Sequence, residues 1–312
     1  MKKIALSLFL LAGSAYAASN MALLMSNRSN EFFLVLEGAF VAKAKELGHA
    51  TDVYDAANDA TKQPGQVEDA IVKKSGAIVI NPLNKDASAD VLNDAVKAGI
   101  PVLAVDTTVD GVDFLAQIAT DNEDGGKFAA EWIVKKSGLE AKDIEGIIHM
   151  KGIDGHSAHI DRYKGFHEFL LKDASWSAVV KDANRYIELT GNFAQDEAQN
   201  ALEAKLSALK PGKKYIIYNE NDVMAVGSIG AITNDSRFNI KDFVVIGFDG
   251  SSEGKKLVDE GKMAITVVQD FAFIGSHAAE LAALYLKDKS KPKSSKIPIE
   301  VIMYPEAQNP RK

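Results

Sequence analysis

Residues 102–106, VLAVD, form a short apolar run that ends in an aspartate, and residues 244–249, VVIGFD, repeat this pattern in the second half of the chain. A continuous apolar run of this length, rich in valine, predicts a β-strand that is buried on both faces, as in a parallel sheet covered by helices. We therefore predict two similar lobes, each of which contributes one carboxylate at the end of a strand.

Outward from these two strands, short β-branched runs alternate with amphipathic stretches along most of the 312 residues. The expected strands are 21–25, 77–80, 102–105, 146–149, 215–218, 243–247 and 264–268, with one more short strand after the polar loop 287–296. The expected helices include 33–47, 87–98, 127–136, 194–209 and 275–286. In the first of these helices, helical spacing relates Leu36, Phe40, Ala44 and Leu47. This alternation predicts the doubly wound α/β class with parallel sheets.

Ligands of doubly wound sheets bind beyond the carboxyl ends of the strands, so the residues that directly follow each strand carry the functional prediction. Those residues are polar after all the internal strands: 26–30, 81, 106–107, 151–157, 219–222, 249–250 and 269–270. Asp, Asn and Gly in such places also form turns and cap helices, which is the alternative at any single position. Their presence at every one of these strand ends favours a shared polar site.

The first residues have the features of a secretory signal peptide, with Lys2 and Lys3 before an apolar run at 4–11 and small residues at Ala15 and Ala17. We expect cleavage after Ala17 and a soluble periplasmic protein, because the run is shorter than the about 20 apolar residues that a membrane span needs. The chain has no cysteine, so its stability depends on its hydrophobic cores.

Charge and motifs disfavour two other classes of function. The formal net charge is −7, and loss of Lys2 and Lys3 leaves −9, without a basic stripe that would bind nucleic acid. A metal-dependent hydrolase is the enzymatic alternative, because four of the six histidines gather at His149, His156, His159 and His167. No HExxH motif or cysteine pair supports such a metal site.

Eight segments of the chain are similar to the periplasmic sugar-binding proteins of the ribose-binding family, in the family's order and at its spacing. They are MALLMSNRSNEFF (21–33), INPLNKDA (80–87), GIPVLAVD (99–106), IATDNEDGG (118–126), GIDGHSAHIDRYKGF (152–166), NENDVMAVG (219–227), VVIGFDG (244–250) and EGKMAITVVQ (260–269).

The resemblance implies the type I periplasmic binding fold, in which a three-strand hinge joins two doubly wound lobes. The hinge is expected near residues 120–121, 269–270 and 300. The implied division is a signal peptide at 1–17, one lobe from 18–120 plus 270–300, and a second lobe from 121–269 plus 301–312.

The implied function is that of the periplasmic solute-binding component of an ABC importer, which delivers a sugar or polyol to a membrane permease. The resemblance implies a monomer without catalytic residues, bound metal or cofactor. A chemotaxis or sensor receptor for the same ligand is the alternative. A sugar-responsive DNA-binding regulator shares the fold, but the expected signal peptide stands where its DNA-binding head would be.

The family's sugar-binding positions carry over to this sequence where the motifs match. In the first lobe they are Ser26, Asn30, Phe32, Phe33 and Asp106, and in the second lobe and hinge they are Arg162, Phe193, Asn221, Asp249 and Gln269. These residue types suit a sugar, because carboxylates, amides and guanidinium bond hydroxyls while aromatic rings cover the C–H faces.

Each of these residues has a structural alternative. Phe32 and Phe33 are adjacent at a helix start, so one ring is expected in the core and the other in the cleft. Arg162 has a surface ion pair with Asp161 or Asp154 as its alternative. Capping of the helix that starts at Ser252 is the alternative for Asp249, and a purely hinge role is the alternative for Gln269.

One position departs from the ribose-binding pattern, in which an arginine follows the aspartate of the fourth strand. Here Thr107 follows Asp106. Arginine only donates hydrogen bonds, whereas threonine donates and accepts and leaves more room. We therefore expect a ligand that is somewhat larger than ribose and hydroxylated all around, such as myo-inositol or a hexose.

Overall fold

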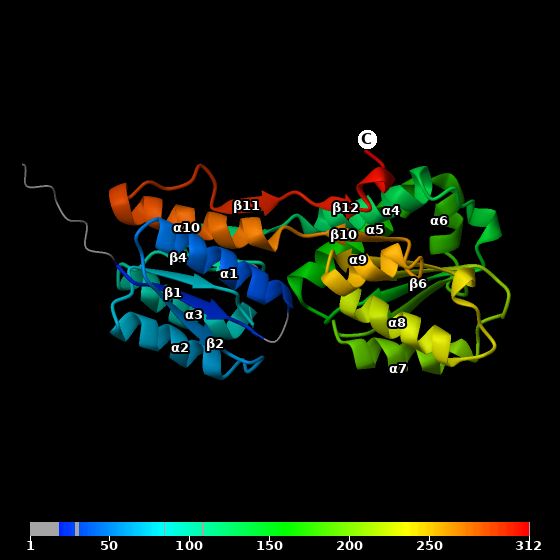
Figure 1. The fold of residues 1–312 in the computed structure, drawn as a ribbon, viewed down its shortest axis with the longest axis horizontal. Helices are drawn as coiled ribbons and strands as arrows, with labels where there is room; N and C mark the ends of the chain where they lie inside the picture. Colours follow the sequence, from blue (N-terminus) through cyan, green and yellow to red (C-terminus); the bar gives the residue numbers. More distant parts are fainter. Residues whose placement is uncertain (1–18, 29–30, 84, 108, 312) are drawn as a thin grey trace, which may run out of the picture.

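The computed structural model describes residues 19–28, 31–83, 85–107 and 109–311, so the expected signal peptide lies outside the described residues. Two six-stranded sheets form the two lobes, which lie side by side in Figure 1. In spatial order the first sheet contains β11 (Lys296–Ile299), β5 (Ala116–Thr120), β4 (Val102–Val105), β3 (Ala77–Ile80), β1 (Met21–Met25) and β2 (Thr51–Asp55). The second contains β12 (Ile302–Tyr304), β10 (Ile265–Val268), β9 (Phe243–Asp249), β8 (Tyr215–Asn219), β6 (Gly146–Lys151) and β7 (Tyr186–Thr190).

The two sheets have the same strand order, which confirms the expectation of two similar lobes. Position by position, β4 of the first sheet corresponds to β9 of the second, and these are the strands of the VLAVD and VVIGFD segments. All paired strands are parallel except one pair, since β12 runs antiparallel to β10. The sheets are therefore parallel as predicted except at this edge, which the chain reaches directly from β11 without a crossover helix.

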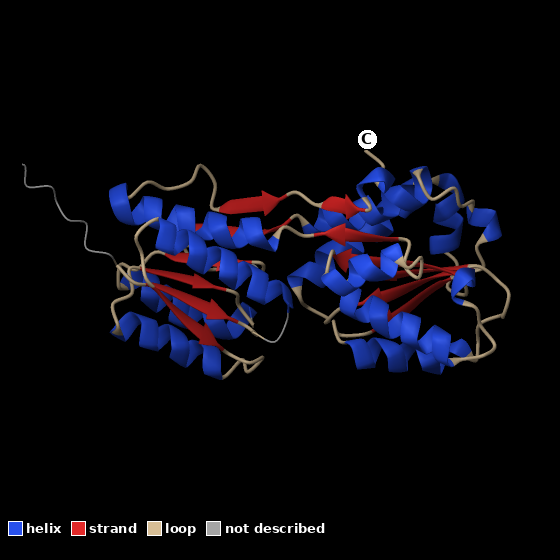
Figure 2. Cartoon of the chain, viewed as in Figure 1, coloured by secondary structure: helices blue, strands red, loops and turns tan. Residues whose placement is uncertain are grey.

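Helices cover both faces of each sheet, as Figure 2 shows. The first sheet is covered by α1 (Glu31–Glu46) and α10 (Phe271–Asp288) on one face and by α2 (Lys62–Val72) and α3 (Lys85–Lys97) on the other. The second is covered by α4 (Asn122–Lys135), α5 (Ser157–Lys172) and α6 (Ala174–Val180) on one face and by α7 (Gln195–Leu206), α8 (Asp222–Asn234) and α9 (Ser252–Asp259) on the other. Short 3₁₀ turns occur at Ala141–Asp143, Ile240–Asp242 and Glu306–Gln308.

The two faces of each sheet pack against different hydrophobic cores, as β1 illustrates. Met21 and Leu23 pack under α1 and α10, whereas Ala22 and Leu24 pack under α2 and α3. Of the four residues expected to form the apolar face of the first helix, three are fully buried. The fourth, Leu47, lies beyond the end of α1 and is 42% exposed.

The chain passes between the lobes three times, after β5, after β10 and between β11 and β12. These passages lie next to one another in the structure, since the N–H of Asp121 donates to the carbonyl of Ile299 at 2.9 Å. The side-chain oxygens of Thr120 and Gln269 also form a hydrogen bond, which links the first passage to the second. No helix in the described part of the chain has the length and apolar character of a membrane span.

Candidate functional site

Four polar side chains at the ends of β1, β3 and β4 form one hydrogen-bonded group in the first lobe. Asn81 is the centre of this group, because its Nδ2 donates to Asp106 Oδ2 at 3.1 Å and to Thr107 Oγ1 at 3.4 Å. Ser26 Oγ donates to Asn81 Oδ1, and Thr107 Oγ1 donates to Asp106 Oδ2 at 3.1 Å. The rigid strand ends thus fix the direction of each donor and acceptor before any ligand arrives.

The second lobe contributes a charged group in which Arg162 is the central residue. Its side chain is only 5% exposed, its Nε donates to Asn122 Oδ1 at 2.8 Å, and its Nη1 donates to the carbonyl of Glu220 at 2.5 Å. Arg162 Nη1 also lies 3.8 Å from Asp249 Oδ1, and the guanidinium stacks 3.8 Å from the centre of the Phe248 ring. The alternative of a surface ion pair with Asp161 or Asp154 is therefore wrong.

Asp249 and Gln269 form a second pair beside this arginine. Gln269 Nε2 donates to Asp249 Oδ1 at 2.6 Å, and Gln269 also bonds Thr120 across the hinge. Burial raises the pKa of Asp249 to about 8, against the opposing effect of Arg162, and repulsion from Asp222 adds to the increase. Asp249 does not cap α9, because Ser251 accepts the N–H of Gly254 there.

Both strand-end aspartates have unusual backbone conformations. The φ angle is +64° at Asp106 and +116° at Asp249, a region that non-glycine residues rarely adopt. Such conformations cost about 1–3 kcal/mol each and concentrate at functional sites. In both lobes, therefore, the aspartate at the end of the corresponding strand has a positive φ angle that orients its carboxylate.

Aromatic rings complete the site from both lobes. Phe32 and Phe33 lie at the start of α1 and pack against Phe271, with ring centroids 5.2 and 6.4 Å away. Phe32 belongs to the hydrophobic core and also lines the cavity, so the expected division between the two rings holds only in part. Phe193 has a φ of +58° and packs edge to face against His156, with centroids 5.4 Å apart.

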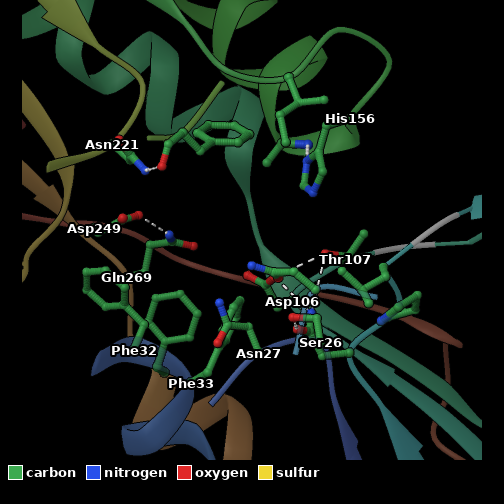
Figure 3. A pocket seen from close by; sticks show the side chains of 18 of the residues that line it. Ser26, Asn27, Phe32, Phe33, Asp106, Thr107, His156, Asn221, Asp249 and Gln269 are labelled. Atoms are coloured by element: carbon green, nitrogen blue, oxygen red, sulfur yellow. Dashed lines mark hydrogen bonds between the residues drawn. The ribbon is translucent and has the colours of Figure 1, made fainter. Parts of the chain in front are cut away.

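One cavity of about 510 Å³ joins these groups. All the sequence-predicted site residues that the structure describes line it: Ser26, Phe32, Phe33, Asp106, Thr107, Arg162, Phe193, Asn221, Asp249 and Gln269. Asn30 lies outside the described residues. Figure 3 shows Asn221 and His156 facing Phe33, Ser26 and Asp106 across the cavity. The shared cavity between Asp106, Arg162 and Asp249 is the arrangement that the sequence predicted.

Further residues line the cavity besides these. Some lie in the strand-end segments that the sequence predicted to form a polar site: Asn27, Asn81, Ile153 and His156. Others lie outside those segments and were not expected: Asn58, Leu83, Asn192 and Phe271. His156 Nδ1 accepts the N–H of Ala158 as the cap of α5, at 3.2 Å.

The histidine cluster does not form a metal site. His149 and His159 both bond the carboxylate of Glu220, and His167 stacks on the ring of Tyr163. Within the described ranges, no group of three or more His, Asp or Glu side chains is arranged to hold a metal ion.

The comparisons with known proteins agree with this geometry. The family model described as "Periplasmic binding protein domain" matches residues 21–290. The ribose import binding protein RbsB of Salmonella typhimurium is 31% identical over 307 residues, which cover 96% of this chain and 97% of that protein.

Solved structures give the same result for the fold. The periplasmic binding protein of the arabinose ABC transporter from Shewanella sp. ANA-3 has a TM-score of 0.78 at 25% identity, covering 91% of this chain and 92% of its own. The Caulobacter myo-inositol binding protein has a TM-score of 0.80 at 24% identity, covering 92% and 93%.

Proposed function

The chain belongs to the periplasmic binding protein family, and we propose that it binds a monosaccharide or cyclic polyol between its lobes for import by an ABC permease. It is a solute-binding protein and not an enzyme, in keeping with its relatives. The observation that carries the proposal is the single cavity lined from both lobes by Asp106, Arg162 and Asp249.

The polar groups of the cavity match a ligand with hydroxyls around its edge. Asp106 and Asp249 accept hydrogen bonds, Arg162 donates them, and the amides of Asn81 and Asn221 do both. Phe33 and Phe193 supply apolar surface for the C–H faces of a ring. A cavity of about 510 Å³ has room for a six-membered ring with its full set of hydroxyls.

We expect ligand binding to close the two lobes. Contacts from both lobes are made together only in a closed form, so a ligand favours that form by its differential binding free energy. The three passages between the lobes form the hinge, and the division at residues 120, 270 and 300 is part of this proposal. A permease would recognise the closed form as the occupied one.

Thr107 leads us to propose a ligand larger than ribose, such as myo-inositol or a hexose. Its hydroxyl is already bonded to Asp106 and Asn81, so it both donates and accepts at the floor of the cavity. Some curated relatives are ribose import binding proteins by name and others are D-apiose or D-allose binding proteins, so relatives of this chain differ in ligand. An arginine at this position would instead present donors only.

The proposed periplasmic location is supported by the family and by the expected signal peptide. We propose that residues 1–17 direct export and are removed, so that the protein works in the periplasm. N-terminal sequencing of the protein from a periplasmic extract would test this, with Ala18 as the expected first residue and an uncleaved Met1 as the contradictory result.

Isothermal titration calorimetry tests the ligand proposal. D-ribose, D-allose, D-glucose and myo-inositol are titrated into protein that has been unfolded, freed of small molecules and refolded. We expect micromolar or tighter binding, corresponding to about −8 kcal/mol, for at least one hexose or myo-inositol. Tight binding of ribose with no binding of the larger ligands would contradict the ligand proposal, and no binding of any sugar or polyol would contradict the function.

A further inference from the structure

A fully buried carboxylate lies directly behind the ligand site, and the proposed function does not use it. Glu220 is 0% exposed, and two histidines and one backbone N–H converge on its two oxygens. His149 Nε2 lies 2.8 Å from Oε1, His159 Nδ1 lies 2.8 Å from Oε2, and the N–H of Gly152 donates to Oε2 at 2.8 Å. These three donors come from β6, from α5 and from the loop between them.

The protonation states of this cluster follow from its hydrogen bonds. The hydroxyl of Tyr186 lies 2.7 Å from His149 Nδ1, and burial raises the pKa of Tyr186 well above its usual value. A carboxylate only accepts hydrogen bonds, so His149 donates to Glu220 from Nε2 and His159 donates from Nδ1. Burial alone would raise the pKa of Glu220, but the hydrogen bonds from His149 and His159 outweigh burial and lower it. Glu220 is thus an ionised carboxylate held by donors.

Glu220 connects this cluster to the ligand site by two routes. Its backbone carbonyl accepts Arg162 Nη1 at 2.5 Å, and Arg162 lines the cavity. Its side chain holds Gly152, the first residue of the loop 152–156, and the same loop places Ile153 and His156 in the cavity wall. A displacement of Glu220 would therefore reach the cavity through both the arginine and the loop.

We propose that Glu220 is a positioning residue of the ligand site, whose carboxylate is held by His149, His159 and Gly152 so that Arg162 and the loop 152–156 are fixed before ligand binds. This positioning role depends on the proposed function only in its predicted effect on ligand affinity. The positioning itself is a property of the free protein, so it can be tested without any ligand.

The first test is NMR of the ligand-free protein. Glu220→Gln keeps the shape but leaves one acceptor oxygen, so its amide N–H₂ would oppose the donor at Gly152. We expect at least tenfold faster hydrogen exchange at the Gly152 amide and broadening of the Arg162 Nε–H signal. The control is Ser137→Ala, which removes a half-buried hydroxyl beyond the C-terminal end of α4 in the same lobe, bonded to the carbonyl of Ile133 and to the N–H of Leu139. It should lower the unfolding midpoint and leave both signals unchanged.

A second pair of variants removes one donor and restores it. His159→Leu deletes the Nδ1 donor and should reproduce the effects of Glu220→Gln. His159→Asn should rescue them, because its amide nitrogen takes the place of Nδ1. If Glu220→Gln does not fold, the two His159 variants still test whether Glu220 positions the loop and Arg162. Unchanged Gly152 exchange and an unchanged Arg162 signal in folded Glu220→Gln or His159→Leu would overturn the proposal.

Affinity gives the functional readout, with myo-inositol and D-ribose as the probes. Glu220→Gln should weaken binding of whichever probe binds the wild type at least tenfold. In an Arg162→Lys background the same change should cost clearly less than in the wild type, because one of its two routes to the cavity is already gone. An equal loss in both backgrounds would overturn the role of Arg162. If neither probe binds the wild type, the ligand proposal fails while the NMR comparison still tests positioning.

Discussion

Asp249→Asn should change how the stability of the second lobe depends on pH. Asp249 is 7% exposed, and burial raises its pKa to about 8 from the model-compound value of 3.8. Between these two values the folded protein binds one more proton than the unfolded chain. The free energy of unfolding therefore falls as the pH rises through this window, and the stabilising contribution is fully present only below the unfolded pKa.

The expected magnitude follows from the two pKa values. One pH unit over which the proton difference is complete corresponds to about 1.4 kcal/mol. Between pH 5 and pH 8 the unfolded aspartate is ionised throughout, while the folded one loses its proton only near the upper limit. This single residue should thus remove roughly 3 kcal/mol of stability from the wild type across that interval. Asparagine does not titrate, so the variant should lack this part of the decrease.

Tryptophan fluorescence in urea measures this lobe selectively. The chain has two tryptophans, Trp132 and Trp176, and both lie in the same core of the second lobe. The ligand-free wild type, Asp249→Asn and the exposed control Asp143→Asn are unfolded at pH 5 and at pH 8. The control should follow the wild type, because Asp143 lies on the surface of the same lobe. If Asp249→Asn and the wild type lose the same free energy between the two pH values, the assignment of a protonated Asp249 is refuted.

Three further variants test packing, ring contact and ligand selectivity. Gly275→Ala would place a Cβ 2.2 Å from the carbonyl oxygen of Leu36, so α1 and α10 must separate, and the urea midpoint should report a loss of about 1–3 kcal/mol. Phe193→Ala removes a cavity ring and should weaken binding of the best sugar in calorimetry by about 1.5–3 kcal/mol, whereas Phe193→Tyr should stay within about threefold. Thr107→Arg should shift selectivity toward D-ribose over myo-inositol at least tenfold, and an unchanged ratio in calorimetry would remove Thr107 from the ligand argument.

The sequence predicted most of the central strands, but at the sheet edges it predicted only one short strand after the loop 287–296, where the structure has both β11 and β12. All the internal strands except β5 were expected, because they are continuous apolar runs. The missed strands β2 and β7 are the outermost strands of their sheets, and they carry polar residues that remain partly exposed. β5 contains Gln117 and Thr120, which break the apolar pattern where the strand enters the hinge. Hydrophobic patterning thus identifies strands that are covered on both faces and loses those that are not.

Helix boundaries were displaced for a related reason. The apolar pattern of α4 begins near residue 127, but the helix starts at Asn122, because Asp121 caps it by accepting the N–H of Asp124 at 2.9 Å. The first turn is polar because its side chains bond charged groups, Asn122 with Arg162 and Asp124 with Arg311. α10 also begins four residues before the predicted start at 275, because Asp270 caps it, although its first turn is apolar.

The site was predicted through strand ends and resemblance, whereas its electrostatics were not. Asp106 and Asp249 hold corresponding positions in two similar sheets, yet the first is hydrogen-bonded by Asn81 and Thr107 and the second is buried beside Arg162. Which carboxylate is buried depends on side chains distant in sequence, such as Gln269, and no local pattern reports them.

This difference between Asp106 and Asp249 indicates that the two similar lobes bind the ligand in different ways. The first lobe presents donors and acceptors whose directions are already set by hydrogen bonds among Asn81, Asp106 and Thr107, so it can bind a hydroxyl with little rearrangement. The second lobe holds Asp249 in its protonated form near neutral pH because burial disfavours the charge. A ligand hydroxyl that donates to this carboxylate stabilises the ionised form, so binding should release a proton. Calorimetry at pH 7 in buffers of different ionisation enthalpy should therefore give different apparent binding enthalpies, and Asp249→Asn should make them equal.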